Sequence, residues 1–558
     1  MKRYLANGEI YIWLTGAFLG LSIIMIAGML VLISVNGIAY FNPHPIDRFM
    51  VVEGGDSLNL LGQVYSSEEI PQEVIDAKGF DPTGESPMRY LVRVGNREVF
   101  GQDFVWINGP EIVAQERPPD AICMERSEYG NAYGFIQSLE AGPDRMVNNE
   151  VDAWDAFTTV HERVMTLVNQ IRSIEKSDLG GLSYRMEEYR LEKVELDYDL
   201  EHQALDPQDY RRRTEEIAEE LRGLDAEFET LQQAIDSLRA LSEGYVVHLR
   251  IFGGEPGETV RIPVSSIVRS YKPNVMTMAE VAGFYASKTW EFLSDDPREA
   301  NAEGGVFPAI FGTVMMVLIM TIAAVPFGVL SALYLREYAA DGVMVRTVRI
   351  AVNNLAGVPS IVFGMFGLGF FVYFIGGGID SLLYPERLPS PTYGTGGILW
   401  ASLTLALLTV PVVIVATEEA LAAIPRGMRE GSLALGATKW ETIRRVVLPS
   451  ATPGIMTGAI LAMARGAGEV APLMITGVVK LATELPFDAH FPFFHLDRKF
   501  MHLGFHIYDV GFQTSNVEAN IGMVYTTTLL LLAIILLLNL SAIIIRARLR
   551  RKYRLVGF

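Results

Sequence analysis

Six long apolar segments constrain the fold of this chain more than any other feature. Each segment holds roughly 20 or more mostly apolar residues, enough for a helix to cross a hydrocarbon core about 30 Å thick. The segments cover about residues 10–35, 306–335, 348–375, 397–424, 452–479 and 521–545. The first follows Lys2 and Arg3, but it is longer than the apolar stretch of a signal peptide, which predicts a retained anchor. The predicted fold is a membrane all-α core with six transmembrane helices.

Basic residues in the short loops predict which side of the membrane each loop faces, because cytoplasmic loops are enriched in Lys and Arg. The C-terminal tail carries Arg546, Arg548, Arg550, Arg551, Lys552 and Arg554, and the loop at about 425–450 carries Arg426, Arg429, Lys439, Arg444 and Arg445. Both regions are therefore predicted to be cytoplasmic. With six spans, the N-terminus is then also inside, and residues 37–305 lie outside.

The distribution of charge agrees with this division. Residues 37–305 contain 50 acidic and 25 basic residues, and the rest of the chain contains 15 acidic and 21 basic residues. The formal net charge of −19 argues against general nucleic-acid binding. A single cysteine, Cys123, excludes an intrachain disulfide and a four-cysteine zinc site.

Residues 37–305 are predicted to form an α+β domain between the N-terminal anchor (1–36) and a core of five spans (306–558). Alternating apolar residues predict β-rich parts at about 50–150 and 244–275. Apolar residues spaced 4-3-4-3 predict a coiled-coil helical hairpin at about 151–243, with bends or turns at Gly180-Gly181 and Asp206-Pro207. The hairpin is interpreted as a spacer, a docking arm for another protein or a ligand sensor, and the heptads alone do not decide among these.

A further helix is predicted at 276–293, immediately before the second span. Its amphipathic pattern favours a position at the outer membrane surface, with Trp290 and Phe292 as anchors in the interface.

The predicted cytoplasmic loop at about 425–450 consists of two short helices. The first ends at Gly436, and the second starts near Thr438 and stops at Pro449. Gly436 is expected to make the turn between them, because glycine adopts a left-handed conformation without a steric penalty. The residues that define the pattern of this loop are Glu430, Gly431, Ser432, Gly436, Leu448 and Pro449.

Two ionisable residues, Arg465 and Glu469, lie inside the predicted fifth span. A charged side chain at membrane depth is costly unless it is paired or faces a watery cavity, and the i, i+4 spacing predicts a pair on one helix face. A stripe of small residues at every fourth position, Gly454, Gly458, Ala462 and Gly466, runs beside the pair. Such a stripe lets another helix pack closely, so the charged pair is expected to point into the assembly.

These motifs resemble those of ABC-importer permeases. Glu430-Gly431-Ser432, Gly436 and Leu448-Pro449 match the spacing of the EAA loop of that family, with Gly and Ser in place of two alanines. The run from Ala464 to Leu473 resembles a segment of the A-type permeases of bacterial high-affinity phosphate importers, as do the runs that start at Phe311, Val325, Tyr334, Asn354 and Thr417. The likeness covers about residue 304 to the C-terminus, and the large insertion at 37–305 departs from the common short form of the family.

The resemblance implies the permease core of an ABC type I importer for phosphate, in the bacterial inner membrane, with residues 37–305 in the periplasm. It implies a C-type permease as heterodimer partner, two ATP-binding subunits and a periplasmic phosphate-binding protein. In the family, the EAA loop docks on the ATPase and transmits its closure to the spans. ATP would be used by the partner subunits, and this chain would need no cofactor. The sequence holds no phosphate-binding loop and no zinc-protease or hydrolase motif, so the chain is not expected to be an enzyme.

Arg465 is expected to supply a positive field for a crossing phosphate anion, since a guanidinium offers fixed donors to phosphate oxygens. Glu469 is expected to pair with it, and a purely structural ion pair is the alternative. Two other functions stay open: a permease for molybdate, tungstate or sulfate, and a non-transporting receptor or scaffold that uses the hairpin.

Two further groups of polar residues are set aside. His490, His495, Asp497, His502 and His506 fit no specific metal-site spacing, so no metal is expected there. Asp380 and Glu386, in another outer loop, are expected to be solvated.

Overall fold

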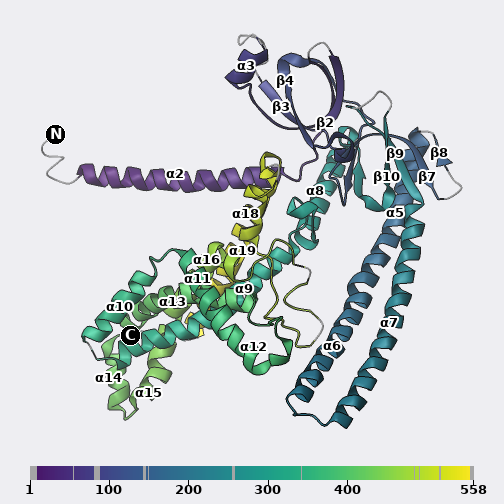
Figure 1. Cartoon of the computed structure of the whole chain (residues 1–558). Helices are drawn as coiled ribbons and strands as arrows, with labels where there is room; N and C mark the ends of the chain where they lie inside the picture. Colours follow the sequence, from purple (N-terminus) through teal and green to yellow (C-terminus); the bar gives the residue numbers. More distant parts are fainter. Residues whose placement is uncertain are drawn as a thin grey trace. The chain divides into compact units, whose positions relative to one another are not determined.

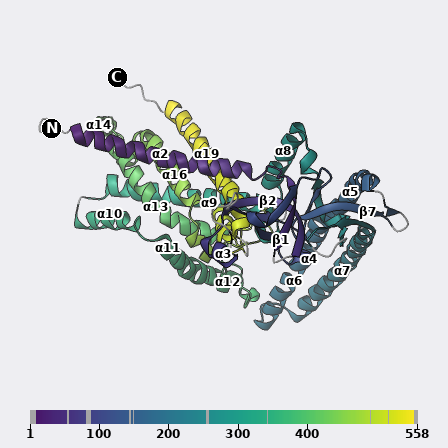
Figure 2. The same cartoon turned by 90° about the horizontal axis from the view of Figure 1, so that it is seen from above.

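The computed structural model describes residues 9–53, 56–78, 80, 88–142, 146–148, 150–253, 258–340, 342–482, 484–488, 491–514 and 517–552. The chain divides into two compact units (Figures 1 and 2). We call residues 1–40 together with 291–558 the membrane unit, and residues 41–290 the sheet unit.

The described residues include six helical segments long and apolar enough to cross a membrane, which confirms the predicted helical membrane core. These are Tyr11–Ala39, Phe307–Tyr338, Ser360–Leu383, Ile398–Ala422, Lys439–Ala467 and Asn520–Arg548. The helices that build them are α2 (Glu9–Ala39), α9 (Phe307–Leu333), α11 (Ser360–Phe366), α12 (Gly377–Leu383), α13 (Ile398–Ala422), α15 (Lys439–Thr442), α16 (Leu448–Ala467) and α19 (Val517–Lys552). Shorter helices connect them: α10 (Val343–Leu355), α14 (Arg426–Ala434), α17 (Ala471–Thr476) and α18 (Leu503–Phe512).

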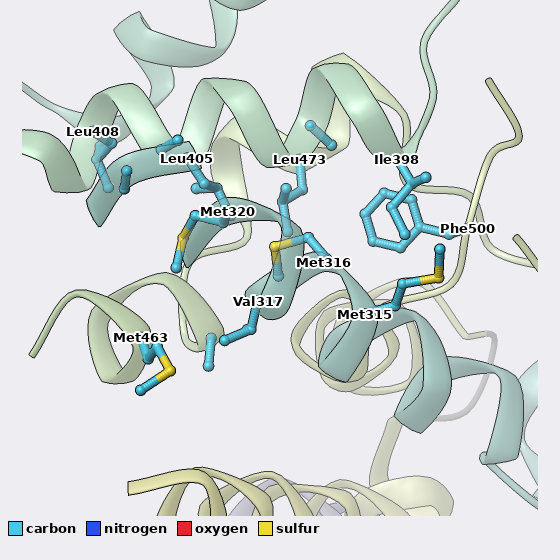
Figure 3. Close-up of a cluster of buried hydrophobic side chains, with 14 of the residues drawn as sticks. Met315, Met316, Val317, Met320, Ile398, Leu405, Leu408, Met463, Leu473 and Phe500 are labelled. Carbon is cyan, nitrogen blue, oxygen red and sulfur yellow. The ribbon is translucent and has the colours of Figure 1, made fainter. Parts of the chain in front are cut away.

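The centre of the membrane unit is the packing of α13 against α9 and α16, which also contact each other. Its core is methionine-rich, and Figure 3 shows Met316 and Met320 of α9 near Leu405 of α13 and Leu473 of α17. Met316 and Leu405 are completely buried. The unbranched side chains of methionine fill irregular gaps between helices that cross at different angles.

Two of the predicted spans have different bounds in the structure. The third begins at Ser360 and not near residue 348, because α10 ends at Leu355 and Pro359 precedes α11. A proline lacks the backbone N–H that a continuous helix would need, and it disfavours helical geometry in the residue before it. The fifth runs over Lys439–Ala467 and not 452–479.

The fifth span starts earlier because Pro449 does not stop the helix. A π-helical segment, η9 (Ile443–Val447), ends two residues before Pro449, and the helix continues through Pro449 into the rest of α16. The wider π turn offers a way to accommodate the missing N–H of a proline within a helix. The prediction that the second loop helix ends at Pro449 is therefore wrong.

The sheet unit contains two antiparallel sheets. The first has the strand order β4-β3-β2-β1-β5, and the second has the order β10-β9-β7-β6-β11, with β8 paired to β7. The strands are β1 (Ile46–Glu53), β2 (Asp56–Glu69), β3 (Met88–Arg93), β4 (Phe104–Asn108), β5 (Ile112–Glu116), β6 (Ile122–Arg126), β7 (Ala132–Ala141), β8 (Met146–Val147), β9 (Tyr245–Arg250), β10 (Thr259–Pro263) and β11 (Ile267–Tyr271). A small pair, β12 (Pro297–Arg298) and β13 (Glu303–Gly304), belongs to the membrane unit.

The helical hairpin grows out of the second sheet. Its first arm is α5 (Glu150–Ser173), η2 (Ile174–Leu179) and α6 (Gly180–Glu201), and its second arm is α7 (Pro207–Glu243), which packs against the first (Figure 1). At the base, Phe157 and Val164 of α5 are fully buried in one core with Val247 and Leu249 of β9. The base of the hairpin is therefore part of the sheet core.

The two predicted breaks in the hairpin have different outcomes. Gly180-Gly181 is not a turn, because the chain remains helical through η2 and α6. Asp206-Pro207 does follow the reversal of the chain, and the carboxylate of Asp206 caps α7 by accepting a hydrogen bond from the backbone N–H of Gln208 at 2.8 Å.

Helix α8 (Met278–Ser294) occupies the position predicted for the amphipathic helix. Trp290 is 71% exposed, whereas Phe292 is buried at 3% exposure. Phe292 therefore packs inside the protein, and the prediction that it anchors the helix in the membrane interface is wrong.

Candidate functional site

The loop between α13 and α16 has the turn geometry expected from its sequence. Gly436 adopts a φ of +86°, which L side chains rarely adopt, and it follows α14. Two residues later, Thr438 caps α15: its hydroxyl accepts from the N–H of Glu441, and the Glu441 carboxylate accepts from the N–H of Thr438. This reciprocal cap fixes the start of the second helix.

One arginine ties this loop to the membrane helices. Arg429 of α14 pairs with Glu337 of η6 (Tyr334–Tyr338), with 2.9 Å between Nη2 and Oε1. The same guanidinium donates to the carbonyls of Leu421, at 2.7 Å, and Ile424, at 2.8 Å. From the sequence, Arg429 was predicted only as a basic residue of the loop, and its ion pair with Glu337 was not predicted. The sole local signal was the presence of both residues at the predicted cytoplasmic side.

A second contact joins the two short helices to each other. The hydroxyls of Ser432 and Thr442 are 2.9 Å apart, and Thr442 is buried. Below them, Ile443 and Val447 are buried against Leu421 and Leu333. The predicted residues Ser432 and Leu448 thus lie on the side of the loop that faces the bundle, where Leu448 packs against this cluster.

Several large apolar side chains of the loop are exposed, beside charged residues such as Arg426 and Lys439. Leu435 is 91% exposed, and Leu433 and Trp440 are also exposed. Glu430 and Gly431 share this exposure. Large apolar side chains exposed on a short, well-anchored loop are typical of a surface that binds another protein.

Arg465 and Glu469 lie close together, but not on one continuous helix. The distance from Nε to Oε1 is 3.8 Å, and the side chains are 34% and 23% exposed. Helix α16 ends at Ala467, and the N–H of Glu469 turns back to the carbonyl of Gly466. The pair therefore bridges the break between α16 and α17, which corrects the predicted i, i+4 geometry inside a single helix.

The stripe of small residues on α16 faces neighbouring helices. A Cβ atom at Gly454 would lie 2.3 Å from the Cβ of Ala420, and one at Gly458 would lie 2.8 Å from the Cβ of Ala416. A Cβ at Gly466 would lie 2.3 Å from the sulfur of Met320 in α9. Ala462 is completely buried between these positions. The stripe thus lets α13 and α9 approach α16 closely.

The described histidines after α17, His495, His502 and His506, are buried. His495 lies 3.0 Å from the carboxylate of Asp488, and the Nδ1 of His502 accepts a hydrogen bond from the N–H of Gly504. Among the described residues, no three His, Cys, Asp or Glu side chains are placed to hold a metal ion. His490 lies outside the described residues.

One acidic residue of the other loop is not solvated. Asp380 is completely buried and accepts hydrogen bonds from the backbone N–H groups of Tyr393, at 2.9 Å, and Gly394, at 2.6 Å. The expectation of a solvated carboxylate is therefore wrong for Asp380, because it closes the loop that follows α12.

Comparison with known proteins agrees with this geometry. Residues 324–485 match the family model described as "Binding-protein-dependent transport system inner membrane component". The match includes the C-terminal part of α9, the anchored loop, the stripe and the ion pair. This part of the chain is similar to the permeases that the family model describes, in agreement with the resemblance of the sequence motifs.

Individual relatives are similar over the same region. A probable ABC transporter permease protein, YqgH of Bacillus subtilis, is 34% identical over 36% of this chain and 62% of its own length. The phosphate transport system permease protein PstA of Mycobacterium leprae is 35% identical over 38% of this chain and 65% of its own length. PstA 1 of Mycobacterium tuberculosis H37Rv is 38% identical over 31% of this chain and 50% of its own length. The chain thus covers less than two thirds of each of these relatives.

Proposed function

We propose that this chain is the transmembrane permease subunit of an ATP-driven phosphate importer. In this role it lines the translocation pathway and couples to a separate ATPase through the loop at 425–450. The observation that carries the proposal is the loop itself. Arg429 fixes it to the spans, it exposes large apolar side chains, and it lies within a region that matches a transport-permease family. Two of the relatives are named as phosphate transport system permease proteins, which supports phosphate as the cargo.

The anchoring of the loop gives a physical route for coupling. Arg429 binds Glu337 at the end of α9 and two carbonyls at the end of α13. A displacement of α14 by a bound subunit would therefore move both helices together, because packed helices shift as rigid bodies. ATP would be hydrolysed by two partner subunits, with a C-type permease and a phosphate-binding protein completing the complex.

Arg465 is proposed to act on the anion. Its side chain is partly exposed and is not fully neutralised, since Glu469 approaches only to 3.8 Å. A guanidinium held at a helix break could meet a passing oxyanion and return to Glu469 when the anion leaves. A purely structural ion pair predicts instead that a lysine in this position would support transport as well as arginine.

The sheet unit and its hairpin are proposed to be periplasmic, with both ends of the chain in the cytoplasm of a bacterial cell. The uneven charge supports this orientation, because the basic residues gather in the tail and in the loop at 425–450. The hairpin is proposed to form a coiled-coil arm or spacer. Its paired helices leave long charged faces in solvent.

The proposal is tested by phosphate uptake into proteoliposomes that contain the chain with its partner subunits and binding protein. We expect ATP-dependent uptake for the wild type, none for Arg465→Ala, and reduced uptake for Arg465→Lys. Leu435→Asp should prevent binding of the ATPase subunit, whereas Leu241→Asp, an equally drastic change at an exposed position of α7, should not.

An assembled complex that hydrolyses ATP but takes up no phosphate would contradict the phosphate assignment. Competition by molybdate, tungstate or sulfate would then identify another oxyanion. A complex that assembles with Leu435→Asp would contradict the proposed docking role of the loop.

A further inference from the structure

An ionic cluster around a buried carboxylate lies at the end of the membrane unit opposite to the anchored loop (Figure 1), and the lysine of this cluster, Lys480, has a side chain that is 39% exposed. Asp509 of α18 is completely buried, and its Oδ2 is 3.1 Å from the Nζ of Lys480, which follows α17. Asn301 donates to the same oxygen at 3.2 Å and to the carbonyl of Lys480 at 2.9 Å. We call Asp509, Lys480 and Asn301 the clasp, because they join three segments that are distant in the sequence.

A histidine with no partner lies beside the clasp. His506 precedes Asp509 by three residues on α18, so the two side chains share one side of the helix. His506 is 2% exposed, yet neither of its ring nitrogens has a hydrogen-bond partner among the described residues. The Oδ1 of Asp509 is also buried without a described partner. Buried polar atoms are nearly always satisfied in folded proteins, and these atoms are available for a hydrogen bond in a second arrangement of the cluster.

The clasp holds the segment that contains α17. Backbone hydrogen bonds join Val479 to Phe500 and Phe500 to Gly477, just before Lys480. At the other end of α17, Gly504 packs against Val470, the residue after Glu469. Movement of α17, and of the helix break that carries Glu469, therefore requires that Lys480 leave Asp509 or that α18 move with it.

Release of Lys480 would leave a buried carboxylate without a counter-charge, which is strongly unfavourable. We propose that His506 is a proton-binding site that replaces Lys480 as the counter-charge of Asp509 when the clasp opens, so that acid favours the open state. The exchange is balanced: Lys480 leaves as an ammonium group, one proton enters from solvent, and the imidazolium of His506 donates to the free oxygen of Asp509.

The charged groups that face His506 determine whether acid favours the open or the closed state of the clasp. Burial lowers its pKa to about 4 in the closed state, with Asp509 raising the pKa and Lys480 lowering it. When Lys480 leaves, its lowering effect on the pKa of His506 is lost, whereas the raising effect of Asp509 remains. The pKa of His506 is therefore higher in the open state. The state with the higher pKa is favoured as the pH falls.

Other ionisable groups near α18 do not offer the same exchange. His502, which caps the N-terminus of α18, already accepts a hydrogen bond at Nδ1, and burial lowers its pKa to about 3. Helix α9 carries no ionisable side chain over Phe307–Leu333, and η5 (Glu299–Asn301) carries Glu299 beside Asn301. In α19, Tyr525 is the first ionisable residue whose side chain is described.

The test measures opening directly, without transport. In a Cys123→Ser background, Val478→Cys places a thiol at a position that is 8% exposed, next to the clasp. Leu481→Cys places a control thiol at a position that is 52% exposed. The ratio of their labelling rates with a membrane-impermeant maleimide corrects for the effect of pH on the thiol itself.

If the open-state pKa of His506 returns to the ordinary value of 6.5, the ratio should rise about tenfold between pH 7.5 and pH 5.5, because one proton is taken up on opening. His506→Gln should abolish the rise. Lys480→Met should raise the ratio at neutral pH and make its rise in acid smaller, because Asp509 then lacks its cation in the closed state as well.

His495→Gln is the matched control, since this histidine is buried and lies 3.0 Å from another carboxylate; it should retain the rise. A ratio independent of pH, or a rise that persists in His506→Gln, would overturn the proposal. Since no anion is transported in this assay, a failure of the phosphate assignment would leave its outcome unchanged.

Discussion

At the scale of single residues, Arg429 makes the connection on which coupling depends. Its guanidinium serves a carboxylate and two carbonyls at once, which the single ammonium group of lysine does not reproduce. We expect Arg429→Lys to assemble with its partners but to lose about tenfold in uptake, about 1.4 kcal/mol, while ATP hydrolysis continues. Parallel assays of uptake and hydrolysis measure this uncoupling. Arg426→Lys, on the same helix but exposed, should behave as the wild type.

Two glycines of the same loop should respond in opposite directions to alanine. Neither has a neighbouring atom within 4 Å of an added Cβ, so only backbone effects remain. Gly436 has a φ of +86°, and Gly436→Ala should lower stability by about 1–2 kcal/mol. Gly431 lies within α14, and Gly431→Ala should raise stability by up to about 1 kcal/mol. Protease cleavage rates within the loop report both; equal shifts would contradict the assignment of the turn to Gly436.

At the scale of helices, close packing of α16 on α13 depends on the absence of side chains. Because a Cβ at Gly458 would lie 2.8 Å from Ala416, Gly458→Val should separate the two helices and destabilise the membrane unit by about 1–3 kcal/mol. Thermal unfolding in detergent measures the loss. Gly28→Val is the control, since an added Cβ at Gly28 of α2 meets nothing within 4 Å. Similar losses in the two variants would show that valine itself, and not the contact, is harmful.

Helices and local turns were predictable from the sequence, whereas their interruptions and partners were not. The length of the apolar segments predicted the spans, and the spacing of apolar residues predicted the hairpin. The conformational freedom of glycine predicted the turn at Gly436. Pro449 and Gly180-Gly181 were misjudged because π-helical turns absorb residues that usually end a helix. Glu337 and the burial of Asp380 were missed because each depends on contacts that the chain makes only after folding.

At the scale of the whole molecule, the structure shows where the hairpin can be separated from the rest. Its ion pairs define the register of the two arms: Glu175 with Arg239, Arg185 with Glu227, and Glu192 with Arg213. The base, by contrast, contributes Phe157 and Val164 to the sheet core. Removal of all of 151–243 would therefore expose that core, and it would not test the hairpin alone.

A shorter deletion follows from this register. Replacement of residues 188–224 by a four-residue turn with glycine keeps the base and two ion pairs, Glu175–Arg239 and Arg185–Glu227. We therefore expect the sheet unit to remain folded and phosphate uptake to stay within about twofold of the wild type. Replacement of 151–243 should unfold the sheet unit, because losing a buried phenylalanine side chain alone costs about 3–5 kcal/mol. Limited proteolysis shows whether the sheet unit is folded in each of the two deletion variants, and phosphate uptake shows whether the variant transports. If the short deletion folds but abolishes uptake, the hairpin acts in transport, as a docking arm would, and is not merely a spacer.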